Sequence, residues 1–176
     1  CSFVSQSIEG CMNLVPEYVD KLCEEIEYTG KIVQRMGLVL DTVYFGGGTP
    51  TTLEAYQLEK IMKTIAKSFD MTNVREYTVE AGRADTITEE KLRTIKANGC
   101  TRISVNPQTL NDSVLEAIGR KHTAKQFFDS FELARNVGFG CAGASWGYRS
   151  KEVLSREQPD FLADSFVVFN LTVLCD

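Results

Sequence analysis

The first strong pattern along the chain is an apolar repeat at helical spacing over residues 15–36. Pro16 stands near the first turn and Gly37 just past the end, as is typical of a helix. Residues 39–45 (VLDTVYF) follow, and their β-branched and aromatic side chains predict a buried strand. This strand runs directly into the glycines of residues 46–48. The pattern therefore predicts a long amphipathic helix and then a strand that ends in a glycine loop.

The order of strand, turn and helix recurs along the chain. After the glycine loop, Thr51 and Glu54 have the spacing of a capping box and predict the start of a second helix. Residues 77–81 (YTVEA) predict a second strand, and the helix after it is expected to begin at Thr88 and to end at Gly99. The inner face of the helix after the glycine loop is expected to carry Leu58, Ile61, Met62, Ile65 and Phe69.

A third unit begins with a strand predicted at residues 102–106 (RISVN) and continues with helices expected to start near Asn111 and Thr123. Strands that alternate with helices, without hairpin signals, are typical of parallel βαβ units, so the predicted fold class is α/β. A doubly wound sheet and a barrel share this periodicity, but polar residues at three successive strand ends favour the mouth of a (β/α) barrel. A closed barrel takes about 250 residues, and the chain has 176, so a partial barrel is expected.

The regular pattern ends after Gly138. Residues 140–158 show no clear period, while residues 166–174 (FVVFNLTVL) could form one more strand. No low-complexity segment or linker divides the chain before this point. We therefore expect residues 1–139 to form one domain and residues 140–176 to be a divergent or truncated tail.

Composition and charge narrow the classes of partner. The chain is 43% hydrophobic and 24% charged, carries a net charge of −5 and has a mean hydropathy of −0.14. No apolar run approaches the roughly 18 residues of a membrane span, and an acidic chain lacks the basic surface that nucleic acids require. We therefore expect neither a membrane nor a nucleic acid as partner. Six cysteines without paired spacing, and no visible secretory signal, predict a reducing, cytoplasmic compartment.

The glycine loop is the first candidate binding site. Gly46, Gly47 and Gly48 precede Thr49 at the point where a strand ends and a helix begins. Without a Cβ, such a backbone can approach a ligand closely and donate N–H groups to a carboxylate, a phosphate or an amino acid. The loop lacks the spacing of a dinucleotide-binding motif and the lysine of a Walker A loop. A tight turn without a ligand is the alternative.

Several polar residues near the predicted strand ends are further candidates. Glu80 stands near the end of the second strand, where a buried carboxylate needs a cation or a donor; a solvated strand end or an ion pair with Arg83 is the alternative. Gln108 follows the third strand and Arg120 lies beyond a short helix, so each could contact a ligand or be an ordinary surface group. His122, the only histidine, has no facing carboxylate or serine motif and is expected to be a solvated loop residue.

Other catalytic classes find no support in the sequence. No serine elbow and no C-x-x-C pair are present, which argues against a serine hydrolase and against a structural zinc site. Cys23 and Cys100 fall on or beside core-facing positions, so we expect them to be small buried hydrophobic residues.

Several of these motifs together resemble the radical S-adenosylmethionine (SAM) enzymes. The resemblance rests on Cys1 with Phe3, on residues 43–50 (VYFGGGTP), on Glu80, and on the segments NPQ at 106–108 and RKHT at 120–123. It covers about residues 1–139, and within the family these residues resemble the oxygen-independent coproporphyrinogen III oxidase (coproporphyrinogen dehydrogenase-like) branch. The resemblance implies a partial (β/α) barrel of the radical SAM type, without the first strand, in a fragment of a longer enzyme.

The resemblance also implies cofactors and the residues that bind them. In the family, a C-x-x-x-C-x-x-C loop followed by an aromatic residue holds a [4Fe–4S] cluster; Cys1 would be its last cysteine and Phe3 the aromatic residue. The spacing from Cys1 to Cys11 or Cys23 does not reproduce this loop, so the first two cysteines would lie upstream. Arg83 matches a family arginine near the glutamate. SAM would be bound by the glycine loop and by three polar side chains, namely Gly46, Gly47, Gly48, Thr49, Glu80, Gln108 and Arg120.

The activity implied is the oxygen-independent oxidative decarboxylation of coproporphyrinogen III to protoporphyrinogen IX in haem biosynthesis. In the family, the reduced cluster cleaves SAM to a deoxyadenosyl radical, which takes hydrogen from a propionate side chain; carbon dioxide is then lost and a vinyl group remains. A porphyrinogen substrate and an electron donor would be the partners. The alternatives are a haem carrier, another radical SAM relative, or an inactive fragment without a cluster, and the last is what we expect of the isolated chain.

Overall fold

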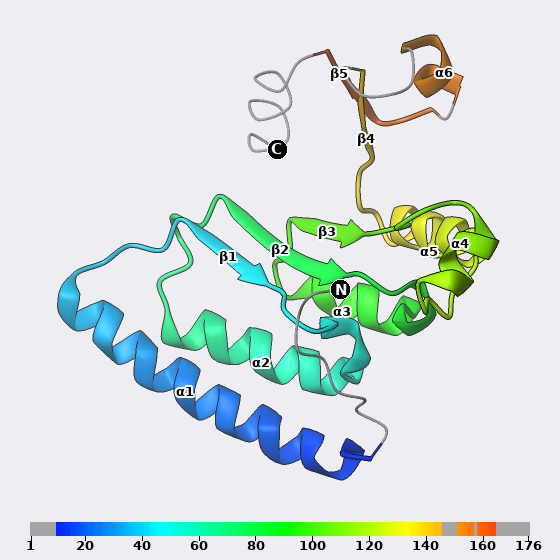
Figure 1. The fold of residues 1–176 in the computed structure, drawn as a ribbon. Coiled ribbons are helices and arrows are strands. Elements are labelled where there is room, and N and C mark those ends of the chain that lie inside the picture. The colour runs from blue at the N-terminus through cyan, green and yellow to red at the C-terminus, as the bar shows by residue number, and fades with distance from the viewer. Residues whose placement is uncertain (1–9, 146–150, 157, 165–176) are drawn as a thin grey trace.

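The structure is a computed structural model that describes residues 10–145, 151–156 and 158–164 (Figure 1). Helices and strands alternate along most of this part of the chain. The strands are β1 (Thr42–Phe45), β2 (Glu76–Ala81), β3 (Arg102–Val105), β4 (Ala142–Ala144) and β5 (Phe161–Ala163). The α-helices are α1 (Val15–Met36), α2 (Ala55–Ser68), α3 (Glu89–Ala97), α4 (Asp112–Ala117), α5 (Ala124–Asn136) and α6 (Lys151–Arg156). Short 3₁₀ turns lie at η1 (Met12–Leu14), η2 (Pro50–Thr52) and η3 (Ala84–Thr86).

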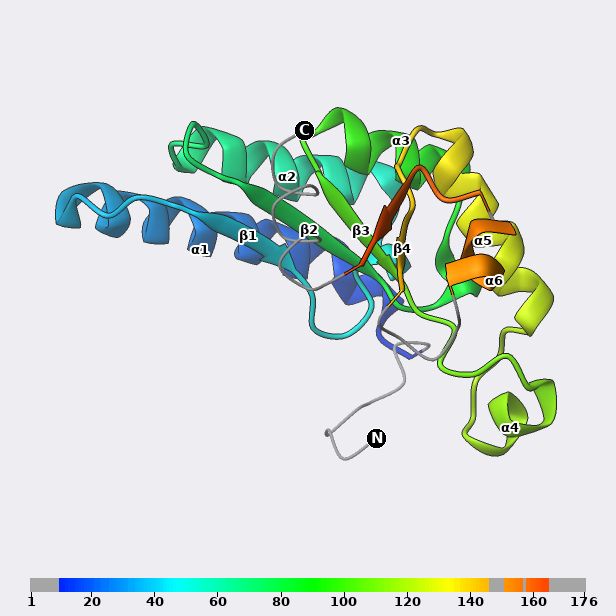
Figure 2. The same ribbon diagram turned by 90° about the horizontal axis from the view of Figure 1, so that it is seen from above.

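The first three strands form one parallel sheet in the order β1-β2-β3. The helices α1, α2 and α3 lie together on one face of this sheet in Figure 1, and Figure 2 shows α5 at the side that carries β3. A doubly wound sheet carries helices on both faces, whereas sequential strands with helices on one face are the arrangement of a (β/α) barrel. The predicted α/β class and partial barrel are confirmed.

The core lies between this sheet and its covering helices. Leu58, Ile61 and Met62 of α2 are fully buried and pack with Tyr77 and Val79 of β2. Burial of each large apolar side chain contributes about 1.5–3 kcal/mol, so this contact dominates the stability of the unit. The same cluster takes in Val15, Val19 and Cys23 of α1. The predicted inner face of α2 is confirmed at Leu58, Ile61 and Met62, which are fully buried, and at Ile65, which is half-buried and packs against the same cluster. Phe69 is the C-cap of this helix.

Three helix starts lie where the sequence predicts them. Thr88 caps α3 by accepting a hydrogen bond from the N–H of Lys91 at 3.3 Å. Asn111 caps α4, and Thr123 forms a capping box with Gln126 at the start of α5. These caps are interactions between residues two or three apart, which explains why sequence alone identifies them.

The predicted start of α2 is wrong. Thr51 does not cap this helix but lies inside η2, where its side chain is fully buried. The helix begins three residues later, with Glu54 as N-cap and the Gln57 side chain accepting from the Glu54 N–H at 2.9 Å. Pro50 opens a separate 3₁₀ turn directly after the glycine loop, and this turn uses the residues that the prediction assigned to the cap.

The predicted first strand also begins too early. Pairing starts at Thr42, opposite Glu76, rather than at residue 39. Val39 is apolar but 67% exposed, because it precedes the segment that the β2 strand can pair. The backbone bond from the Arg75 N–H to the Asp41 carbonyl, at 2.9 Å, marks the beginning of the ladder.

Beyond Gly138 the structure contains a second, small sheet. β4 and β5 pair in parallel, and α6 lies between them in the chain. Residues 140–158 therefore hold regular elements where the sequence shows no clear period, because three-residue strands and a six-residue helix are shorter than periodicity can detect. The possible strand at 166–174 lies outside the described residues, and the boundary at residues 139 and 140 stays a prediction.

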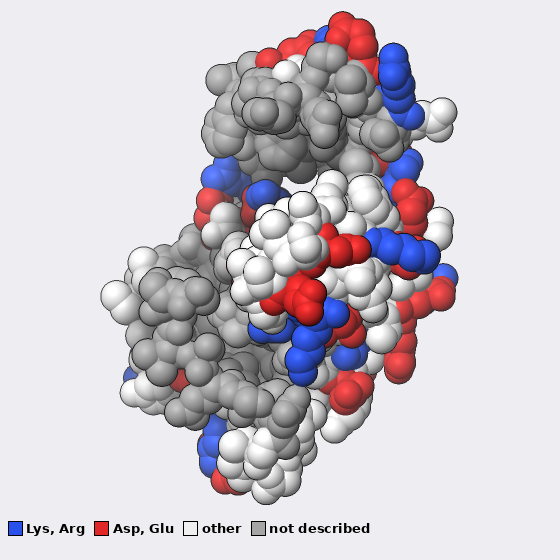
Figure 3. Space-filling view, turned by 45° about the vertical axis from the view of Figure 1, so that its right-hand side comes forward, with Lys and Arg blue, Asp and Glu red and all other residues white. Residues whose placement is uncertain are grey.

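The described surface carries charges of both signs. On the face shown in Figure 3, acidic and basic side chains lie side by side rather than in one patch of a single sign. The α5 pair Lys125–Asp129, at 2.6 Å, is one such contact. In the described part of the chain, no helix has the length and apolar composition that crossing a membrane requires.

Candidate cofactor site

The candidate residues gather at one edge of the β1-β2-β3 sheet. Because the three strands are parallel, their carboxyl ends meet at this edge. The glycine loop follows β1 directly, Glu80 is the second-last residue of β2, and Gln108 comes three residues after β3. The register places Glu80 opposite Ser104 and one position beyond the pair Phe45–Val79, so Gly46 comes beside Glu80.

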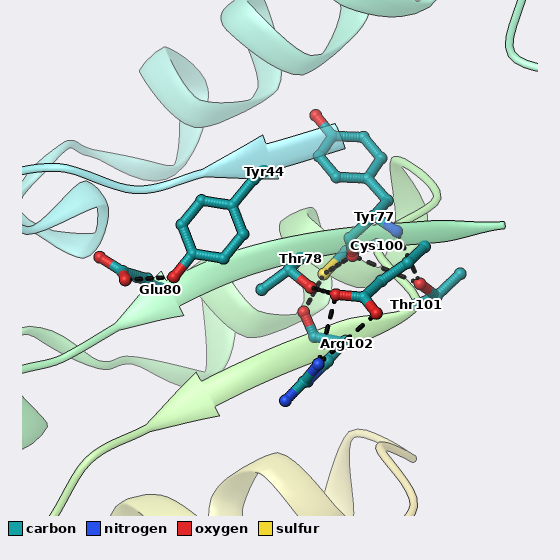
Figure 4. A network of polar contacts seen from close by, with 8 residues as sticks. Tyr44, Tyr77, Thr78, Glu80, Cys100, Thr101 and Arg102 are labelled. Atoms are coloured by element: carbon teal, nitrogen blue, oxygen red, sulfur yellow. Dashed lines mark hydrogen bonds and ion pairs between the residues drawn. The ribbon is translucent and has the colours of Figure 1, made fainter. Parts of the chain in front are cut away.

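Glu80 is held by a residue that the sequence analysis did not single out. The Tyr44 hydroxyl donates a hydrogen bond to Oε1 of Glu80 across the two strands (Figure 4). This bond raises the pKa of the Tyr44 phenol above its ordinary value, because a carboxylate oxygen holds the phenol proton. Tyr44 stands two residues before Gly46 and therefore on the same face of β1, a signal that strand periodicity contains.

The other carboxylate oxygen of Glu80 faces the glycine loop. A Cβ built on Gly46 would lie 3.1 Å from Oε2 of Glu80 and 2.5 Å from a ring carbon of Tyr44. No side chain fits at this position without moving one of the two neighbours. The structure thus brings together two of the predicted site residues, Gly46 and Glu80.

The rest of the glycine loop is open. Gly47 has a φ of 106°, a left-handed conformation that favours glycine. Apart from the adjacent residues in the chain, no atom of the described residues lies within 4 Å of the position that a Cβ would take on Gly47 or on Gly48. A ligand can therefore approach this backbone, as the glycine content predicts. Thr49 ends the loop, and its carbonyl accepts from the N–H and the hydroxyl of Thr52 at 2.9 and 2.7 Å.

A buried lysine binds the backbone directly after the glycine loop. Lys91 of α3 is 9% exposed, and its Nζ donates to the carbonyl of Thr51 at 2.9 Å and to that of Thr86 at 3.4 Å. The hydroxyls of Thr51 and Thr86 also lie 2.6 Å apart. The network joins the loop after β1 to the loop after β2. The sequence analysis missed Lys91, although it shares a helix face with the buried Ile95 four residues later.

Gln108 and Arg120 lie on two loops next to this edge. Gln108 is exposed and has a φ of 61°, which is rare for a residue other than glycine. Arg120 is half-buried and follows Gly119, whose φ of 72° ends α4. Among the described residues, no hydrogen bond or ion pair joins Glu80 to Arg83, Gln108 or Arg120. The pairing of Glu80 with Arg83 that the sequence left open is thus not formed.

The expectation for His122 is wrong. This side chain is only 3% exposed, and its Nε2 lies 3.4 Å from the carbonyl oxygen of Pro107. A histidine beside Lys121 and Thr123 looks solvated in the sequence, but its ring lies against the carbonyl of Pro107 in the loop after β3. The Ala124 N–H donates to the Asp112 carboxylate at 2.7 Å, which joins the starts of α4 and α5 and encloses the loop between them.

The cavities described by the structure lie elsewhere. One cavity of about 240 Å³ lies beside β3, and none of the candidate cofactor residues lines it. Its apolar lining consists of Ile103, Val105, Phe131, Ala134 and Phe139. This cavity is therefore separate from the candidate cofactor residues.

The family described as the Radical SAM superfamily matches residues 1–150. The chain belongs to the radical SAM superfamily. It is 39% identical over 139 residues to the oxygen-independent coproporphyrinogen-III oxidase-like protein HemZ of Bacillus subtilis, covering 78% of this chain and 28% of that protein. It is 40% identical over 126 residues to the heme chaperone HemW of the same organism, covering 71% of this chain and 32% of that protein. The chain thus spans about a third or less of these relatives.

A solved radical SAM structure has the same fold. Coproporphyrinogen III oxidase (HemN) from Escherichia coli superposes with a TM-score of 0.60 at 22% identity, over 90% of this chain and 41% of that one. The radical SAM family implies a [4Fe–4S] cluster and SAM as cofactors.

The described residues fit one of these cofactors and not the other. The open backbone of the glycine loop and the adjacent Glu80 carboxylate suit the amino acid end of SAM. For the cluster, Cys1 and Phe3 lie outside the described residues, and no group of three histidine, cysteine or acidic residues that could hold a metal exists within them. Cys23 and Cys100 are buried, as predicted, and burial raises the pKa of the Cys100 thiol to about 11. Neither is a cluster ligand.

Proposed function

We propose that this chain is the SAM-binding part of a radical SAM oxidoreductase that converts coproporphyrinogen III to protoporphyrinogen IX. The observation that carries the proposal is the juxtaposition of the Glu80 carboxylate with the open glycine loop. An amino acid presents an ammonium group, which needs an acceptor, and a carboxylate, which needs donors. Oε2 of Glu80 is an acceptor beside Gly46, and the loop backbone supplies N–H donors.

Each proposed ligand has its own task. Tyr44 occupies one oxygen of Glu80 and leaves the other for the ammonium group. Gln108, with an amide that both donates and accepts, suits the ribose hydroxyls, and Arg120 suits a carboxylate. Thr49 and the N–H groups of Gly46, Gly47 and Gly48 would hold the methionine carboxylate. Together these residues would orient SAM and exclude water, while the cluster, with Cys1 as one of its ligands and Phe3 beside it, would supply the electron for radical formation.

The porphyrinogen substrate, the electron donor and the cytoplasmic setting belong to the same proposal. The similarity to the coproporphyrinogen-III oxidase-like protein HemZ of Bacillus subtilis supports the porphyrinogen substrate. The heme chaperone HemW, at 40% identity, supports a second candidate, a haem carrier. Anaerobic incubation of the whole protein with coproporphyrinogen III separates the two. Vinyl product formation supports the oxidase, and tight haem binding without turnover supports the carrier.

SAM binding by the chain itself tests the site. We expect Glu80→Gln to weaken SAM binding about 10- to 100-fold in calorimetry, because a charged acceptor is replaced by a neutral one. Glu25→Gln on the exposed side of α1 is the matched control and is expected to bind as the unaltered chain does. Free methionine should compete if the amino acid end lies in the loop. Equal affinities of the Glu80 and Glu25 variants, or no binding by the unaltered chain, would contradict the proposal.

A further inference from the structure

The backbone at Gln108 is strained. Its φ of 61° lies in the left-handed region, and the Thr109 N–H donates to the Pro107 carbonyl at 2.7 Å. These two features define a γ-turn centred on Gln108 with the sign of φ that is rare and costly. Such conformations persist only where surrounding groups hold them, and they concentrate at functional sites. Gln108 is one of the proposed SAM ligands, so the groups that stabilise this turn affect the proposed site.

His122 contacts the same carbonyl. Its Nε2 lies 3.4 Å from the Pro107 oxygen, which can only accept, so a hydrogen bond between them requires the tautomer with the proton on Nε2. In this tautomer the Pro107 oxygen has two donors, one inside the turn and one from the loop after α4. His122 is the only histidine of the chain and is 3% exposed, and the proposed chemistry does not use it.

The loop that carries His122 is itself fixed on both sides. At the end of α4, the N–H groups of Gly119 and Arg120 donate to the carbonyls of Glu116 at 3.0 Å and Leu115 at 2.9 Å. At the start of α5, the Ala124 N–H donates to Asp112 at 2.7 Å. The imidazole is therefore a rigid link between the loop of Arg120 and the turn of Gln108.

We propose that His122 is a positioning residue that holds the Gln108 turn and the Arg120 loop in one arrangement for SAM. This positioning role rests on the proposed function, since Gln108 and Arg120 affect SAM binding only if they contact SAM. Without the imidazole donor, the Pro107 carbonyl keeps a single partner and the turn is free to relax to negative φ. The Gln108 side chain then leaves its position relative to Arg120.

The single histidine makes the link directly observable. Long-range ¹H–¹⁵N NMR spectra of the chain are expected to show one imidazole with its proton on Nε2, and His122→Phe is expected to shift the backbone signals of Gln108. A proton on Nδ1 alone, or unchanged Gln108 signals in the variant, would overturn the proposal. These readouts do not depend on SAM.

Binding measurements with SAM then test the functional consequence. His122→Phe keeps an aromatic ring but no donor, and we expect its SAM dissociation constant to rise about tenfold. His122→Gln restores an N–H donor and should recover most of the affinity, which a purely space-filling role would not allow. Asn98→Ala is the control: it removes a side-chain hydrogen bond to the Thr94 carbonyl at the C-terminal end of α3, and it should leave SAM affinity unchanged.

A Gln108→Asn background provides the coupling test. Asparagine tolerates positive φ better than glutamine, so the turn needs less support from His122 in this background. His122→Phe should therefore raise the SAM dissociation constant less than about threefold there. Equal losses in both backgrounds would overturn the positioning role, as would unchanged affinity in His122→Phe. If the unaltered chain binds no SAM while the Nε2 proton is found, the proposed function fails and the link is only structural. If His122→Phe does not fold, the tautomer and the Gln variant decide the question.

Discussion

Among the described residues, the hydroxyl of Tyr77 is the buried side-chain polar atom that has no hydrogen-bond partner. The Tyr77 ring is 2% exposed and belongs to the core cluster under β2. Burial also raises the pKa of this phenol, since the phenolate would lose its hydration. A tyrosine here fills space as phenylalanine would, but at the cost of an unsatisfied donor.

Replacement of Tyr77 by phenylalanine is expected to stabilise the chain by about 1 kcal/mol, because the unpaired hydroxyl is removed with little change in volume. Thermal or urea unfolding measures this, with Tyr28→Phe, at a 67% exposed site, as the neutral control. Lower stability of Tyr77→Phe would mean that an unseen partner satisfies the hydroxyl.

The same residue predicts a dependence on pH. The pKa of Tyr77 is raised in the folded chain above the unfolded value of about 10. Above this pH the unfolded chain releases the proton first, so the free energy of unfolding falls as the pH rises further. Below about pH 10 the contribution of Tyr77 to the free energy of unfolding is fully present. Tyr77→Phe should show a smaller fall above pH 10 than the unaltered chain.

Single residues also show which properties the sequence predicts and which it does not. Cys23 and Cys100 were expected in the core, and both are there: Cys23 lies on the buried face of α1, and Cys100 lies in the short turn between α3 and β3. The burial of His122 depends on its contact with the loop after β3, 15 residues away in the chain, which no local pattern contains. Tyr44 escaped notice because its partner Glu80 is 36 residues away in the chain.

At the scale of elements, the Lys91 network joins α3 to two loops. Its ammonium contacts the carbonyls of Thr51 and Thr86 and, in the described part of the chain, no carboxylate. Burying a charge costs free energy, and removing a donor leaves carbonyls unpaired, so two effects oppose each other. The hydrogen bond from Lys91 to the Thr51 carbonyl, at 2.9 Å, is of ordinary length. We therefore expect the loss of this donor to outweigh the cost of burying the ammonium.

We therefore expect Lys91→Met to lower the free energy of unfolding by about 1–3 kcal/mol, the cost of buried unsatisfied carbonyls. Urea unfolding measures it, and Lys31→Met on the exposed side of α1 is the control. SAM affinity should fall as well, because the glycine loop loses its anchor. A stabilised Lys91→Met would show instead that desolvation of the ammonium dominates.

At the scale of the whole molecule, the main sheet has two outer edges. Within the described residues, β1 and β3 each pair with β2 alone. Beside β3 lies the cavity of about 240 Å³, partly lined by Ile103 and Val105. Unpaired strand edges next to apolar surface are templates for pairing with another chain.

We expect the isolated chain to self-associate with rising concentration through these edges. Sedimentation velocity from about 1 to 100 μM should show a growing dimer or larger species, as affinities in the micromolar range would produce. A charged substitution at the edge, Ile103→Lys, should reduce the association. A monomer over the whole range would show that the edges are covered.

The amino-acid pattern was sufficient to predict the α/β class, most helix boundaries and the candidate residues of a cofactor site. Helix caps, glycine loops and hydrophobic periods act between residues a few positions apart, so each can be recognised locally. The tertiary structure alone decided that the helices cover one face, that Tyr44 holds Glu80, that Lys91 anchors the glycine loop, and that His122 is buried against Pro107. These contacts join residues 15 to 40 positions apart, and they depend on the strand register and on how the loops and helices pack, which no local signal encodes.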